Sequence, residues 1–92
     1  MEFEWDAIKS SINIDKHGIN FTEAASIFGD PLEMTLGDPD HSVAEFRFIS
    51  LGVSSGGRLL VVSYTERAAR IRIISAREAT PRERREYESK AT

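Results

Sequence analysis

Two adjoining stretches decide the fold: RLLVVSYTER at residues 58–67 and RIRIISAR at residues 70–77. The first is apolar at successive positions, so both of its faces need cover and it should be a central strand. The second alternates, with Ile71 and Ile73 on one face and Arg70 and Arg72 on the other. A tight turn near residues 66–69 should join them. The pair therefore predicts an antiparallel hairpin at the centre of a sheet.

Three shorter segments also suit strands: FEW at residues 3–5, LEMTL at 32–36 and AEFRFIS at 44–50. The last alternates well, so Phe46 and Phe48 should face the core while Glu45 and Arg47 face outward. Tyr64, which alternates with apolar residues in the central strand, should also lie in the core. FEW should be a short first strand, and the other two segments with the hairpin predict an antiparallel sheet of about four strands.

Capping signals delimit two helices near the N-terminus. The first should cover residues 7–17, because Asp6 can serve as its N-cap and Gly18 as its left-handed stop. Thr22 should cap a short second helix, TEAASIF, which ends at the following Gly-Asp-Pro.

A third helix should follow the strands. Thr80 and Glu83 form a capping box, and Pro81 occupies the first helical position. The order of elements predicts a small α+β domain over residues 1–92, with N-terminal helices, an antiparallel sheet and a C-terminal helix.

The composition excludes several classes of function. The chain has no cysteine, so a disulfide framework, a thiolate metal site and a cysteine nucleophile are all ruled out. The opening MEFEWD lacks the features of a signal peptide, and no apolar run approaches the ~20 residues of a spanning helix. We therefore expect a cytoplasmic protein with no membrane contact. His41 lies near Asp38 and Asp40, but the spacing fits no metal motif, and we expect neither metal nor cofactor.

Positive charge is concentrated in one segment of an acidic chain. Residues 1–57 carry three basic and ten acidic side chains, a net charge of −7, whereas residues 58–85 carry eight arginines and three glutamates, a net charge of +5. Arginine suits planar, bidentate partners such as phosphate or carboxylate. We therefore expect one sheet face to form a phosphate-binding platform from arginines on or beside strands: Arg47, Arg58, Arg67, Arg70, Arg72 and Arg77. A solvated strand face is the competing interpretation for Arg70 and Arg72, as an ordinary hairpin edge is for Arg58.

Four segments occur in one order: FEWDAIKSSINIDKHGINFTEA at residues 3–24, RLLVVSYTER at 58–67, RIISAREAT at 72–80 and ERREY at 83–87. This combination resembles the BrnT toxins, the toxin halves of bacterial BrnT/BrnA toxin–antitoxin pairs. The resemblance implies a RelE-like fold and an endoribonuclease that cleaves RNA and arrests growth. It also implies neutralisation by a BrnA-type antitoxin, through which alone the complex binds its operator DNA. Whether the toxin forms a homodimer within that complex is left undecided by the sequence.

RNA cleavage without a metal needs a group that takes the 2′-hydroxyl proton and cations that stabilise the phosphorane-like transition state. Arg67 and Arg77 rank first as cations, because they lie at or just after strand ends and match the family's TER and SAR segments. His17 is the best candidate for proton transfer, since histidine ordinarily titrates near neutrality. Lys16 beside it could steady a phosphate, although both also suit a helix C-terminus. Glu78 could act as a base, but an adjacent arginine would weaken it.

Two hypotheses follow for the function. The first is an endoribonuclease toxin that acts by metal-independent transesterification, with the other arginines of the platform as RNA contacts. The alternative is a non-catalytic RNA- or protein-binding module that acts as an antitoxin-bound corepressor, which the acidic residues 1–57 favour. Arg82, Arg84 and Arg85 suit a solvated face or an antitoxin or dimer contact. The basic sheet face and the last helix should carry the antitoxin interface, because a positive surface attracts an acidic segment.

Overall fold

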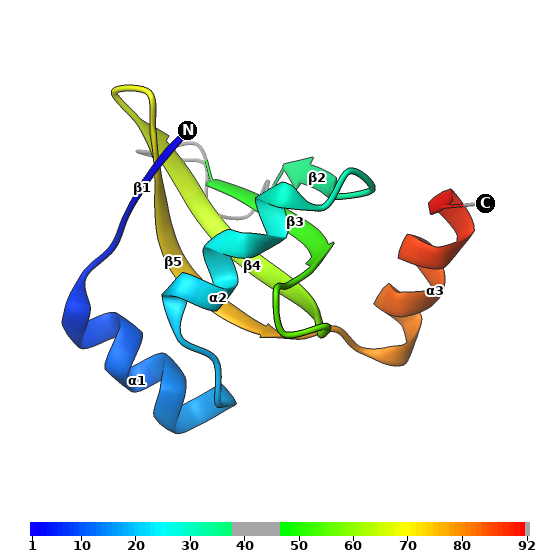
Figure 1. Ribbon diagram of the computed structural model, residues 1–92, viewed down its shortest axis with the longest axis horizontal. Coiled ribbons are helices and arrows are strands. Elements are labelled where there is room, and N and C mark those ends of the chain that lie inside the picture. The colour runs from blue at the N-terminus through cyan, green and yellow to red at the C-terminus, as the bar shows by residue number, and fades with distance from the viewer. Residues whose placement is uncertain (38–46, 92) are drawn as a thin grey trace.

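The computed structural model describes residues 1–37 and 47–91. Within this part, five strands form one sheet in the order β1-β5-β4-β3-β2 (Figure 1). The strands are β1 (Glu2–Glu4), β2 (Met34–Gly37), β3 (Arg47–Val53), β4 (Leu59–Arg67) and β5 (Arg70–Glu78). The helical elements are α1 (Ala7–His17), α2 (Phe21–Ala25), the 3₁₀ helix η1 (Ser26–Gly29) and α3 (Pro81–Ala91). The predicted α+β class is confirmed, with helices near the N-terminus and one helix after the last strand.

The β4–β5 hairpin lies at the centre of the sheet, as its sequence predicts. β4 pairs antiparallel with β3 on one side and with β5 on the other. Ala68 and Ala69 form the turn with φ values of 48° and 68°, and two positive φ values match the twist of hairpin strands. β1 is one strand more than the antiparallel set that the sequence predicts, and it runs parallel to β5.

Local capping residues set the ends of α1 and α3 as predicted. Asp6 Oδ1 accepts from the backbone N–H of Ile8 at 2.8 Å, and α1 ends at Gly18 with φ 69°. Thr80 and Glu83 cap α3 reciprocally: the Glu83 N–H donates to Thr80 Oγ1 at 3.2 Å, and the Thr80 N–H donates to Glu83 Oε1 at 2.9 Å.

The N-cap of α2 is Asn20, and the prediction of Thr22 is wrong. Asn20 Oδ1 accepts from the backbone N–H of Glu23 at 2.7 Å. Both residues are good caps, so local preference does not choose between them. The earlier start buries the Phe21 side chain completely in the core. Tertiary packing therefore selects the cap.

The two faces of the sheet are covered unequally. On one face, α1 and α2 contact β5 (Figure 1), and the main core there includes Leu60, Val62, Tyr64, Ile71 and Ile73. This confirms the inward side of the predicted hairpin. The opposite face, here called the open face, carries Leu51, Leu59 and Val61, and Tyr87 of α3 packs against this smaller cluster.

Several sequence predictions concern residues 38–46, which lie outside the described residues. They include the inward Phe46, the outward Glu45 and the group of Asp38, Asp40 and His41. The neighbouring Phe48 packs against the main core, as expected. In residues 1–37 and 47–91, no helix is long and apolar enough to cross a membrane.

Candidate functional site

Four arginines share the open face near the β4–β5 turn. The strand register pairs Arg67 with Arg70, and it pairs Thr65 with both Arg47 and Arg72. Residues directly opposite each other on antiparallel strands point to the same side of a sheet. We call these four residues the hairpin arginines: Arg47, Arg67, Arg70 and Arg72. The structure thus gathers them on one face, as the platform hypothesis requires.

β1 brings two carboxylates to the hairpin arginines. Its parallel register aligns Glu2 with Arg70 and Glu4 with Arg72. The Arg70 Nε–Glu2 Oε2 distance is 3.4 Å, and the Arg72 Nη1–Glu4 Oε2 distance is 2.8 Å. The first pair is mostly exposed, so water screens it and it contributes little stability. The acidic N-terminal segment nevertheless neutralises part of the platform.

Arg67 and Arg77 lie at opposite ends of the hairpin. Arg67 pairs with Arg70, and Arg77 lies seven residues further along β5. At ~3.3 Å per residue this separation is roughly 23 Å. Two arginine side chains so far apart cannot grip the same phosphate. The two first-ranked cations therefore belong to different regions of the surface.

Arg77 lies on the open face beside α3. Its Nη1 and Nη2 donate to Glu83 Oε1 and Oε2 at 2.8 and 2.9 Å. This bidentate hydrogen bonding, aided by the Thr80 N–H and opposed by burial, lowers the pKa of Glu83 to about 2. It also raises the pKa of Arg77. The Arg77 side chain remains 43% exposed, so an anion from solvent can reach it.

Glu78 does not pair with the guanidinium of Arg77. One of its carboxylate oxygens lies 3.9 Å from Arg58 Nη1, and the Glu78 side chain is 63% exposed. Glu78 therefore faces Arg58 and not the guanidinium of its chain neighbour, because Arg77 turns to Glu83.

Lys16 and His17, at the end of α1, lie beside β5. A hollow of about 170 Å³ between the two elements is lined by Lys9, Ile12, Asn13, Lys16, His17, Ile74 and Ser75. Ser75 and Arg77 are two residues apart on β5, so they share a face with Cα atoms ~7 Å apart. We call Lys16, His17, Arg77 and Glu78 the exit site, because Lys16 and His17 border this hollow and Arg77 and Glu78 follow Ser75 at the end of β5.

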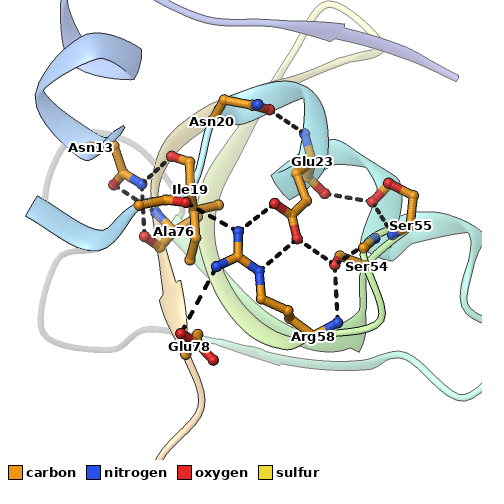
Figure 2. Close-up of polar contacts among 12 residues, drawn as sticks. Asn13, Ile19, Asn20, Glu23, Ser54, Ser55, Arg58, Ala76 and Glu78 are labelled. Atoms are coloured by element: carbon orange, nitrogen blue, oxygen red, sulfur yellow. Dashed lines mark hydrogen bonds and ion pairs between the residues drawn. The ribbon is translucent and has the colours of Figure 1, made fainter. Parts of the chain in front are cut away.

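Asn13 joins the two sides of the exit site. Its side chain is buried, and Nδ2 donates to the carbonyl oxygens of Ile19 and Ala76 at 2.9 and 2.8 Å. Oδ1 accepts from the Ala76 N–H at 3.1 Å, so the amide pairs with β5 as a neighbouring strand would (Figure 2). Sequence reasoning missed this residue. The available signal was an asparagine inside a helix, where it is unfavourable unless its side chain has a specific partner.

Arg58 is held in a separate polar cluster. Its Nε and Nη2 donate to Glu23 Oε2 and Oε1 at 3.0 and 2.5 Å, and Nη2 also donates to the Gly18 carbonyl at 3.1 Å (Figure 2). Ser54 Oγ donates to Glu23 at 2.7 Å. The hydrogen bond from Arg58, more than offsetting burial, lowers the pKa of Glu23. Arg58 thus fastens the start of β4 to the helices, and its expected RNA contact stays a prediction.

The described residues contain no group of three histidine, aspartate or glutamate side chains that could hold a metal ion. The charged and titratable groups of the exit site are two cations, a histidine and an exposed carboxylate. Such a set can bind an anion and transfer a proton.

Comparisons with known proteins place these residues in a family. The family model described as "Ribonuclease toxin, BrnT, of type II toxin-antitoxin system" matches residues 5–83. The chain belongs to the BrnT family. The crystal structure of the Brucella abortus ribonuclease toxin, BrnT, is similar to it with a TM-score of 0.64 and 24% sequence identity, over 87% of this chain and 97% of that one. A comparison with curated proteins finds no match.

Membership of the BrnT family confirms the resemblance carried by the sequence segments. The matched range includes the exit site and all four hairpin arginines. The structural likeness confirms the α+β fold with N-terminal helices, a mostly antiparallel sheet and a C-terminal helix. This chain is therefore a BrnT-type ribonuclease toxin of a type II toxin–antitoxin system by family.

Proposed function

We propose that this BrnT-family toxin cleaves RNA at the exit site by metal-independent transesterification. The observation that carries the proposal is the junction of α1 with β5. There Lys16 and His17 border the same hollow as Ser75, and Arg77 follows on the face of Ser75. A proton-transfer group and a lysine thus border one hollow, and Arg77 lies two residues beyond Ser75, on the open face.

In this reaction the RNA 2′-hydroxyl attacks the adjacent phosphorus and the 5′-oxygen leaves. His17 takes the 2′-hydroxyl proton, with the exposed Glu78 as the alternative base. Arg77 donates hydrogen bonds to the non-bridging phosphate oxygens as their charge develops, and Lys16 donates a proton to the leaving 5′-oxygen. The products are a 2′,3′-cyclic phosphate and a 5′-hydroxyl.

The bidentate pair between Arg77 and Glu83 supports the phosphate role. A phosphate offers the same two-oxygen geometry as a carboxylate, so it can replace Glu83 on the guanidinium. The hairpin arginines then bind flanking phosphates, since Arg72 lies five residues from Arg77, or ~17 Å along β5. RNA binding should weaken with salt, because contacts to phosphates release counterions. Glu2 and Glu4 compete for Arg70 and Arg72, so these two arginines should contribute less to that dependence than free arginines would.

One observation favours a second candidate, a non-catalytic RNA- or protein-binding module that acts as an antitoxin-bound corepressor. Several candidate arginines already face a carboxylate of their own chain: Arg58, Arg70, Arg72 and Arg77. Internal neutralisation reduces the attraction for a polyanion.

The remaining parts of the proposal concern the setting of the activity. A BrnA-type antitoxin neutralises the toxin, and operator DNA is bound only through that antitoxin. The toxin acts in the cytoplasm as one domain of residues 1–92, without cofactor.

Purified protein incubated with single-stranded RNA and excess chelator tests the proposal. We expect cleavage with 2′,3′-cyclic phosphate ends, and Arg77→Ala and His17→Gln should each lower the rate by about 100-fold or more. Arg84→Ala, an exposed arginine of α3 outside the exit site, is the matched control and should cleave normally. Thermal melts of each variant separate loss of activity from loss of fold. Intact RNA with salt-sensitive binding supports the second candidate instead.

A further inference from the structure

A groove lies between β2, at one edge of the sheet, and α3. Its volume is about 600 Å³, within the range of ligand-binding clefts. Met34 and Leu36 of β2 supply apolar side chains, and Leu36 is 50% exposed. Arg82, Arg85 and Lys90 of α3 supply positive charge on the other side.

The basic side of α3 faces the groove because contacts on the adjacent side of the helix fix its orientation. The α3 residues that line the groove recur at positions i, i+3, i+4, i+7 and i+8, which is one helix face. Glu83 and Tyr87 lie on the adjacent face and fix α3 to the sheet. Glu83 binds Arg77, and Tyr87 Oη donates to Asp30 Oδ2 at 2.6 Å. The groove is therefore a consequence of how α3 is anchored.

We propose that this groove binds an acidic segment of the cognate antitoxin, with apolar side chains of that segment seated on Met34 and Leu36. The inference rests on the membership of a toxin–antitoxin family and goes beyond it by placing the partner on the toxin. It separates the antitoxin contact on α3 from the RNA contacts of the exit site.

Charge complementarity identifies the occupant. The α3 residues that line the groove, here called the basic wall, include three cations and one acidic residue, Glu86. The three cations are Arg82, Arg85 and Lys90, so the basic wall is net positive in a chain that is negative overall. A carboxylate-bearing segment meets this wall favourably and is steered toward it. Apolar side chains of the segment that cover Met34 and Leu36 add to the affinity by removing apolar surface from water.

Two other occupants fit less well. Single-stranded RNA needs aromatic or planar surfaces on which bases stack, and the apolar side chains that line the groove are the aliphatic Met34 and Leu36. A second copy of this chain in a two-fold contact would oppose the same basic wall to itself. An acidic protein segment satisfies both the charge and the apolar floor.

Full-length toxin variants titrated with the purified antitoxin encoded beside the toxin gene test the proposal. The double variant Arg82→Glu/Arg85→Glu should lose about 10- to 100-fold in affinity, because it reverses the wall. The control Arg84→Glu reverses one charge on the same helix outside the groove lining, half the charge change of the double variant, and it should lose less than about 3-fold. Leu36→Ser should weaken antitoxin binding without changing how the affinity depends on salt. In Arg82→Glu/Arg85→Glu, the affinity should depend less on salt than in the wild type.

The outcomes are distinct. Equal losses in the wall variant and the Arg84→Glu control, or no loss in either, would overturn the proposal. So would a wall variant that changes self-association in sedimentation but not antitoxin affinity, or one that changes only RNA affinity. Parallel RNA cleavage by the free variants should match wild type. If wild-type toxin fails to cleave RNA, the catalytic proposal fails, while the affinity pattern still decides the groove.

Discussion

Replacing Asn13 with alanine should destabilise the fold more than any other single amide substitution near the exit site. Asn13 makes three hydrogen bonds to backbone groups of Ile19 and Ala76, and all are buried. A net value of about 1 kcal/mol per bond gives a loss of about 3 kcal/mol in the free energy of unfolding. For a domain of this size that corresponds to a fall of roughly 12–24 °C in melting temperature.

Asn20→Ala is the matched control, because it removes an amide of the same size from the surface. Asn20 makes one capping bond, to the Glu23 N–H at 2.7 Å. Loss of an N-cap costs about 1 kcal/mol. The difference between the two variants therefore isolates the buried pairing of α1 with β5.

Urea denaturation followed by circular dichroism measures both variants. We expect the midpoint of Asn13→Ala to fall well below that of Asn20→Ala, with the same dependence on urea. Asn13→Asp should cost at least as much as Asn13→Ala at neutral pH, because a carboxylate cannot donate to the two carbonyls. If Asn13→Ala lies within experimental error of Asn20→Ala, Asn13 does not hold α1 against β5, and the reasoning for a joined exit site is refuted.

Three further predictions concern single contacts. Glu83→Gln should lower the free energy of unfolding by about 1–2 kcal/mol at pH 7, after allowance for solvent screening of the half-exposed Arg77. The difference from wild type should narrow as pH falls from about 4.5 toward 2. Urea titrations across this pH range measure the difference, and a constant difference would contradict the prediction. Tyr87→Phe removes the hydrogen bond to the Asp30 carboxylate and should cost about 1–2 kcal/mol, whereas an unchanged melting temperature would show that α3 is held otherwise. Gly18→Ala meets no neighbouring atom, so only its positive φ should matter, at about 1 kcal/mol; a much larger loss by denaturation would point to a contact instead.

The Glu83 prediction follows from the direction of its pKa shift. The folded-state pKa of about 2 lies below the ordinary value of 4.5, so the ion pair stabilises the fold fully above the ordinary value. That stability is lost as pH falls through the folded-state pKa, because protonation then breaks the pair.

Features decided within a few residues could be predicted from the sequence. Asp6 and Gly18 bound α1, and Thr80 with Glu83 starts α3, because each cap bonds to a backbone group two to four residues away. The central hairpin followed from its apolar pattern. Even here Asn20 displaced Thr22 as a cap, because burial of Phe21 outweighed a near-equal local choice.

The candidate site was only partly predictable. The segments around Lys16, His17 and Arg77 indicated the family, which the comparisons confirm. The distance between Arg67 and Arg77 could have been predicted from the number of residues between Arg77 and the hairpin turn. The ion pair between Arg77 and Glu83 could not, because it depends on where α3 folds back.

By itself the sequence determined which segments become helix and strand, the alternation that puts Arg70 and Arg72 on one face of β5, and the family. The tertiary structure alone decided how those arginines are used. The parallel addition of β1 sets Glu4 against Arg72, and Asn13 meets Ala76 across 63 positions of the chain. The physical reason is range: caps and alternation act over one turn or two residues, whereas strand partners and buried polar bonds are fixed by which surfaces pack together.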